Sequence, residues 1–187
     1  MEFTASALSF MLKNIGKTVC LTGAQIPLSD QKNDAFINIM GSFRVIASYV
    51  IPEVTVYFQD KLMRGNRIKK IDSSHLNAFQ SMVFPPLVVD DVFLQPKFHL
   101  IRKMPGKADH FYVNRNLSTD FVIFSVDTTL KWEVLLDILK KANHIRGVIL
   151  KFPDRTVSSL LHFQKLLEEL VELGKIVWVC SQSQRGA

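Results

Sequence analysis

The alternation of short, largely apolar runs with segments of helical periodicity is the feature that most constrains this sequence. Apolar runs occupy residues 19–22, 54–58, 121–126, 147–151 and 176–180, and helical patterns occupy 4–14, 33–48, 130–142 and 156–173. Strands that are apolar along their whole length are typical of a sheet covered on both faces, and helices between such strands are typical of crossover connections. The pattern predicts an α/β fold with a mostly parallel sheet and flanking helices.

Helical spacing also predicts which side chains face the core. In the segment 33–48 the predicted core residues are Ile37, Met40, Val45 and Ile46. A polar stretch at 72–75 predicts the cap of a short helix that runs to Phe79.

Chain-breaking residues divide the sequence. Prolines at 85, 86, 96 and 105, the last followed by Gly106, make the stretch from 84 to 116 irregular. We therefore expect a partial N-terminal domain over residues 1–104, a linker over 105–117, and a smaller, partial α/β domain over 118–187.

Composition narrows the classes of partner. The net charge of +6 comes from 23 Lys and Arg against 17 Asp and Glu, and the basic residues are scattered, which argues against a nucleic-acid partner. No apolar stretch reaches the length of a membrane span, and the N-terminus has no leader pattern, so we expect no membrane partner. Cys20 and Cys180 lie in strand-like runs and are expected to be buried, reduced thiols of a cytoplasmic protein.

Several residues that could carry chemistry are better explained structurally. The five histidines, at 75, 99, 110, 144 and 162, lack the spacing of metal ligands, so no metal is expected. The serines at 158, 159, 181 and 183 stand outside any nucleophile elbow and are interpreted as turn or capping residues. Asp90 and Asp91 are expected to be a solvated pair. The aromatic residues Phe121, Phe124 and Trp178 are expected in the core.

Four blocks of the sequence resemble the type I, bacterial-type L-asparaginases in order and spacing. They are residues 4–12 (TASALSFML), 21–28 (LTGAQIPL), 51–54 (IPEV) and 64–67 (RGNR) with Lys70 three residues later. The resemblance extends from Met1 to about Pro86. Beyond the irregular stretch it persists only as a pattern of strands and helices.

The resemblance implies hydrolysis of L-asparagine to L-aspartate and ammonia without a cofactor. Members of this family use a threonine nucleophile in a Gly-rich loop, and a second threonine, an aspartate and a lysine that handle protons. By position in the motif, Lys70 matches that lysine, although the sequence pattern alone would make it a solvated charge. Gly23, Ala24 and Gln25 match backbone that lines the substrate pocket, at the end of a strand where ligands commonly bind.

Departures from the family pattern put activity in doubt. Both threonine sites and the Thr-Asp pair would precede Met1, and the sequence stops at Gly186 and Ala187, before the remaining crossovers of the second domain. We therefore expect a chain truncated at both ends. Ala35 and Phe36 replace a glycine-containing turn after Asp34, and residues 151–154 replace a Gly-rich loop.

Two hypotheses follow from these departures. The chain is either an inactive piece of a genuine asparaginase, or a non-catalytic module that pairs with an intact homologue through the helix near residues 34–48, and a homo-oligomer is also expected. A nucleotide-binding domain is disfavoured because no phosphate-binding glycine motif follows any predicted strand.

Overall fold

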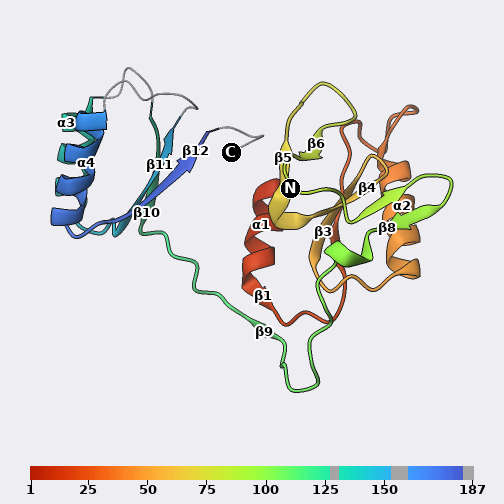
Figure 1. Cartoon of the computed structure of the whole chain (residues 1–187). Coiled ribbons are helices and arrows are strands. Elements are labelled where there is room, and N and C mark those ends of the chain that lie inside the picture. The colour runs from red at the N-terminus through yellow and green to blue at the C-terminus, as the bar shows by residue number, and fades with distance from the viewer. Residues whose placement is uncertain (127–130, 153–159, 183–187) are drawn as a thin grey trace. The chain divides into compact units, whose positions relative to one another are not determined.

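A computed structural model describes residues 1–126, 131–152 and 160–182, with the side chains of 160–162 left aside (Figure 1). The chain forms two compact units, residues 1–117 and 118–187. The α/β class predicted from the sequence is confirmed. The expected limits of domains and linker stay a prediction. Residues 112–113 of the expected linker pair with residues 12–13 within the first unit.

Unit 1 is built on a five-stranded sheet of order β2-β3-β4-β7-β8. Its elements are α1 (Glu2–Met11), β1 (Leu12–Lys13), β2 (Val19–Leu21), α2 (Ala35–Ser48), β3 (Val54–Phe58), β4 (Lys61–Arg64), η1 (Gly65–Arg67), β5 (Ile68–Lys70), β6 (Phe79–Ser81), β7 (Val88–Asp90), β8 (Leu94–Pro96), η2 (Phe98–Leu100) and β9 (Tyr112–Val113). Two small antiparallel ribbons, β5-β6 and β1-β9, accompany the sheet.

The unit 1 sheet is mixed, in contrast to the mostly parallel sheet expected. Only β2 and β3 pair in parallel among its described pairings, whereas β3-β4, β4-β7 and β7-β8 are antiparallel. The cause is the tight turn after β3, where Gln59 and Asp60 have φ of 46° and 57°. Two consecutive residues with positive φ form a two-residue hairpin turn, which reverses the chain and pairs β4 with β3.

A turn replaces the short helix predicted before Phe79. The Asp72 carboxylate accepts hydrogen bonds from the backbone N–H groups of Ser74 and His75 and contacts the His75 ring at Nδ1. These bonds hold the pKa of Asp72 below its usual value. An aspartate that binds the amides two and three residues ahead stabilises a turn as well as it caps a helix, and Phe79 begins β6 instead.

The centre of unit 1 is β3, which is buried on both faces. The Tyr57 hydroxyl donates to Asp90 Oδ2 at 2.7 Å, and Arg44 Nη1 donates to Asp90 Oδ1 at 2.7 Å. The side chain of Asp90 is only 6% exposed, so the expected solvated pair is wrong for this residue. Gly41 of α2 passes so close to the ring that an added Cβ would lie 2.0 Å from the Tyr57 hydroxyl oxygen.

Helix α2 packs on the sheet with an unexpected face. Of the four predicted core residues only Val45 is buried, and Ile37, Met40 and Ile46 are exposed. The buried positions are Ala35, Asn38, Ser42 and Val45. Because Gly41 brings the helix backbone close to Tyr57, small and polar side chains fill the contact and the larger apolar ones point outward.

Unit 2 is a parallel sheet of order β10-β11-β12 whose helices connect successive strands. Its elements are β10 (Phe121–Ser125), α3 (Trp132–Lys141), β11 (Gly147–Phe152), α4 (Leu160–Glu172) and β12 (Ile176–Ser181). Leucines of both helices pack with Val148 and Leu150 of the central strand. The alternation predicted from the sequence is confirmed here, within a residue or two where the ends are described.

The aromatic core predicted for unit 2 is only partly correct. Phe124 packs against the helices, but Phe121 and Trp178 are 42% and 67% exposed. Side chains alternate across a strand, and Ile123 and Trp178 lie in register with Ile149 on the face opposite the helix-covered core. Ser158, Ser159, Ser183, Pro153 and Asp154 lie outside the described residues.

Candidate functional site

The loop that follows β2 carries the predicted substrate-binding residues Gly23, Ala24 and Gln25. β2 is parallel to β3, and Thr22 Oγ1 closes its end by donating to the Tyr57 carbonyl at 2.9 Å. Ala24 is exposed, and Gly23 and Gln25 are half-buried. The loop therefore starts at the carboxyl end of a parallel strand, where backbone groups are available to a ligand.

A buried aspartate holds this loop from the side of α2. Asp34 is 5% exposed, and its Oδ1 accepts from the backbone N–H of Gln25 at 3.0 Å and of Ile26 at 2.9 Å. It stands at the N-cap position of α2 but makes no capping bond to its own helix. The carboxylate thus stabilises the loop in place of the helix end.

Asn38, one helical turn later, completes the anchor. Its Nδ2 donates to the Gly23 carbonyl at 2.9 Å and to Asp34 Oδ2 at 3.1 Å. Its Oδ1 accepts from the backbone N–H of Gln59 at 3.0 Å. The pair, called here the Asp34–Asn38 anchor, joins the loop, the start of α2 and the turn after β3.

Lys70 lies at the end of β5, exposed, in the ribbon that β5 forms with β6. Its backbone N–H donates to the Glu2 carboxylate at the start of α1. Gln25 Nε2 donates to the His75 carbonyl at 3.1 Å, which ties the loop to the connection between β5 and β6. Both predicted parts of the site therefore belong to one connected region of unit 1. The catalytic and binding roles of these residues stay predictions.

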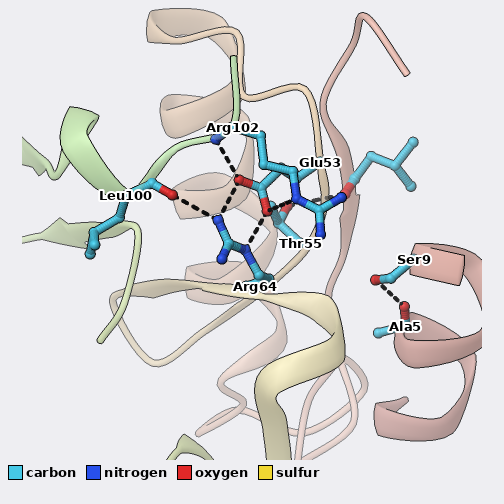
Figure 2. Close-up of polar contacts among 8 residues, drawn as sticks. Ala5, Ser9, Glu53, Thr55, Arg64, Leu100 and Arg102 are labelled. Carbon is cyan, nitrogen blue, oxygen red and sulfur yellow. Dashed lines mark hydrogen bonds and ion pairs between the residues drawn. The ribbon is translucent and has the colours of Figure 1, made fainter. Parts of the chain in front are cut away.

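The segment leading to Lys70 is fixed by a buried ion pair (Figure 2). Arg64 contacts Glu53 through Nε at 2.5 Å and Nη2 at 2.8 Å, and Nη2 also donates to the Leu100 carbonyl at 2.7 Å. The Glu53 side chain is 3% exposed and also accepts from the Arg102 backbone N–H at 2.9 Å. A two-point arginine–carboxylate contact is strong and directional, so it fixes the end of β4.

Gly65, the next residue, allows a close approach of three segments. An added Cβ would lie 2.9 Å from the Val54 carbonyl oxygen and 3.0 Å from Ser9 Oγ of α1. Ser9 itself donates to the Ala5 carbonyl at 2.7 Å (Figure 2). The Arg-Gly-Asn-Arg block therefore packs β4 and η1 against α1, immediately before the ribbon that carries Lys70.

Sequence reasoning did not identify Asp34 and Asn38 as site residues. The available signal was their spacing, because residues four apart share one helical face and here both are polar beside a Gly-containing loop. A polar face toward the sheet departs from the usual pattern, in which apolar residues face the core, so the spacing alone does not predict an anchor.

Among the described residues, no group of three or more His, Cys, Asp or Glu side chains could hold a metal ion. No described helix is long and apolar enough to span a membrane. Cys20 and Cys180 are free and half-buried, and burial raises the pKa of the Cys20 thiol. An apolar cavity of about 480 Å³ lies away from the loop, lined by Leu12, Ile15, Gly16, Lys17, Val19 and Phe111.

The class of the domain follows from two observations: it is an α/β unit, and side-chain hydrogen bonds hold a loop at the carboxyl end of one of its parallel strands. Residues 1–98 match the family described as asparaginase, N-terminal, and the chain belongs to the asparaginase family.

Individual relatives agree with this assignment. The chain is 36% identical over 190 residues to an L-asparaginase of Dirofilaria immitis, covering 100% of this chain and 31% of that protein. It is 49% identical over 110 residues to L-asparaginase 1 of Escherichia coli, covering 59% of this chain and 31% of that protein. The crystal structure of L-asparaginase I from Vibrio cholerae superposes with a TM-score of 0.85 at 32% identity, covering 98% of this chain and 55% of that chain. The chain thus spans 31% of each of these two curated relatives and 55% of the solved one.

Proposed function

We propose that this chain provides the L-asparagine-binding loop and the proton-handling lysine of an L-asparaginase fold, and does not hydrolyse L-asparagine by itself. Gly23, Ala24 and Gln25 contact the substrate in this proposal, and Lys70 handles protons. The observation that carries it is the anchored loop at the end of β2, joined through Gln25 to His75 in the connection that follows the Lys70 strand. A cytoplasmic location without a cofactor is part of the same proposal.

Three hydroxyl groups of unit 1 agree with the proposed absence of hydrolysis. Thr22, Thr55 and Ser9 each donate a hydrogen bond to a backbone carbonyl. A hydroxyl becomes a good nucleophile when a base accepts its proton, and a peptide carbonyl is not such a base. These three hydroxyls therefore serve packing and turn geometry.

Ammonia release from L-asparagine by the purified chain, with Lys70→Ala as control, tests the proposal. We expect no release above that of the control, together with saturable binding of L-asparagine in a calorimetric titration. Turnover that Lys70→Ala abolishes would show that a nucleophile exists within these residues. A titration without binding would overturn the role of the loop.

The role of Lys70 is tested separately in a chimera that supplies a nucleophile. A chimera joins the segment that precedes the matched region in the Escherichia coli L-asparaginase 1 to this chain. We expect ammonia release from the chimera and its loss with Lys70→Ala, while Lys69→Ala, an exposed neighbour in the same strand, retains it. Equal activity of the two variants would remove Lys70 from the proposal.

The outer face of α2 favours a second candidate function, a non-catalytic module that pairs with an intact homologue. Phe36, Ile37, Met40 and Phe43 are all at least half exposed on this helix. A contiguous apolar patch on a helix is typical of an interaction surface. Mixing the chain with an intact L-asparaginase and measuring mass by light scattering tests this idea. A heteromeric species that Phe43→Ser abolishes would support it, and two separate species would contradict it.

A further inference from the structure

The least expected feature of unit 1 is the burial of two polar side chains against the sheet. Asp34 and Asn38 are 5% and 1% exposed, and each costs free energy to bury unless it is fully hydrogen-bonded. We propose that Asn38, acting together with Asp34, is a positioning residue that holds the Gly23–Gln25 loop in the shape that binds the substrate. The proposal rests on the proposed function of that loop.

The contacts of Asn38 allow only one orientation of its amide. Oδ1 accepts from the Gln59 N–H, and Nδ2 donates to the Gly23 carbonyl and to the Asp34 carboxylate. Rotating the amide by 180° would place its NH₂ group against an N–H donor and its oxygen against two acceptors. The side chain is therefore locked by three different segments, which makes it a rigid reference point for the loop.

The anchor bonds to two backbone donors and one backbone acceptor of the loop. Asp34 accepts hydrogen bonds from the N–H groups of Gln25 and Ile26, and Asn38 donates one to the carbonyl of Gly23. The peptide groups on the helix side of the loop are thus satisfied within the protein. Binding to a loop held in this way avoids the entropy cost of ordering it, which is the advantage of a preorganised site.

An exchange of the two side chains separates positioning from stability. In the double variant Asp34→Asn and Asn38→Asp, the side-chain oxygen of residue 34 can still accept from the N–H groups of Gln25 and Ile26, and residue 38 can still accept from Gln59. The bond between the two side chains is kept with its direction reversed, because residue 34 now donates to residue 38. The exchange removes the bond from Asn38 Nδ2 to the Gly23 carbonyl and the second, longer contact of the Gln25 N–H with Asp34 Oδ2 at 3.2 Å, while Gln25 keeps its bond to the other oxygen of residue 34. A purely structural pair would tolerate this exchange without loss of ligand affinity.

The matched control lies on the same buried face. Ser42, one turn further along α2, is 5% exposed, and its hydroxyl donates to the Ile39 carbonyl within the helix. Ser42→Ala therefore alters a buried polar group of α2 at a position that bonds to its own helix.

Calorimetric titration of L-asparagine into the 187-residue chain is the deciding experiment, with the folded fraction of each variant taken from urea unfolding. We expect the exchanged pair to be folded and to bind about tenfold more weakly, the effect of losing one hydrogen bond of positioning. The affinity of Ser42→Ala for L-asparagine should lie within about twofold of that of the wild type, which is less than the loss of one hydrogen bond to the loop would cause. Equal affinity of the folded exchange variant and the wild type would overturn the inference.

Amide hydrogen exchange distinguishes failure of the anchor from failure of the proposed function. If the wild type does not bind L-asparagine, the proposed function fails, and exchange at Gln25 and Ile26 then decides whether the anchor orders the loop. Faster exchange at these two amides in Asn38→Leu than in Ser42→Ala would support the ordering role. Unchanged exchange would overturn it.

Discussion

Units 1 and 2 bury different kinds of side chain. Among the described residues, the buried polar ones are Asp34, Asn38, Ser42, Glu53 and Thr55, all in unit 1, whereas the buried cluster of unit 2 is entirely apolar. Apolar burial is non-directional and tolerates small shifts, but a buried polar group is stable only in one geometry. The comparison teaches that unit 1 adds buried hydrogen bonds to its apolar clusters, whereas the buried cluster of unit 2 is held together by apolar packing.

Breaking the ion pair of Glu53 should produce the largest effect. Glu53→Leu leaves the largely buried Arg64 guanidinium without its carboxylate, and we expect a loss of about 4 kcal/mol in the free energy of unfolding of unit 1. Urea unfolding followed by tyrosine signals measures it, because Tyr49, Tyr57 and Tyr112 all belong to unit 1. The double variant with Arg64→Met should recover most of this loss. If the double variant is no more stable than Glu53→Leu alone, the pair stabilises unit 1 through its packing and not through its charge.

Deleting part of the unit 2 core should cost slightly less and leave unit 1 unchanged. Leu139 is 1% exposed, and Leu139→Ala should destabilise unit 2 by about 3 kcal/mol through lost burial and the cavity that remains. Tryptophan fluorescence reports this transition alone, since both tryptophans, Trp132 and Trp178, lie in unit 2. An equal shift of the tyrosine signal would show that the two units unfold together.

The close approach of α2 to β3 predicts a smaller but still substantial effect. Gly41→Ala places a methyl group against the Tyr57 hydroxyl, which Asp90 holds in place, so the helix must shift. We expect a loss of about 2 kcal/mol in the stability of unit 1, the usual cost of overpacking. Ala47→Gly, at an exposed position of the same helix, is the control for helix propensity. Unchanged stability of Gly41→Ala would mean that α2 slides freely on the sheet.

The smallest expected effect concerns Tyr57 and pH. Burial, followed by its bond to Asp90, raises the pKa of the Tyr57 hydroxyl above its usual value near 10. Above that pH the unfolded chain loses this proton while the folded chain keeps it, so stability falls with rising pH by about 1.4 kcal/mol per pH unit for this group. Tyr57→Phe should cost about 1 kcal/mol at neutral pH and flatten the alkaline slope. Parallel slopes for the two proteins would contradict this assignment.

The same contrast explains what the sequence could predict. In unit 2 each strand and helix follows its local apolar pattern, so the elements were found from spacing alone. In unit 1 the buried face of α2 depends on Gly41 meeting Tyr57, and the hairpin after β3 depends on left-handed conformations at Gln59 and Asp60. Such conditions arise between segments, or from backbone conformations that side-chain patterns do not encode.

The candidate site divides in the same way. The loop Gly23–Gln25 and Lys70 were found through resemblance to a family, because the residues alone show a turn and a charged strand end. The sequence does not predict Asp34 and Asn38 as site residues, because they bond to backbone groups of other segments. Backbone donors and acceptors carry no sequence signature, so a residue chosen to satisfy them is visible only in three dimensions.

The β1-β9 ribbon has a consequence for the order of folding. It pairs Leu12 with Val113, so the first unit closes on itself only after residue 113 has been synthesised. The pairings of unit 2 join strands separated by a single helix, and contacts of short sequence separation form faster than distant ones. We therefore expect the ribbon to close late in the folding of unit 1, after local pairings such as the β3-β4 hairpin have formed.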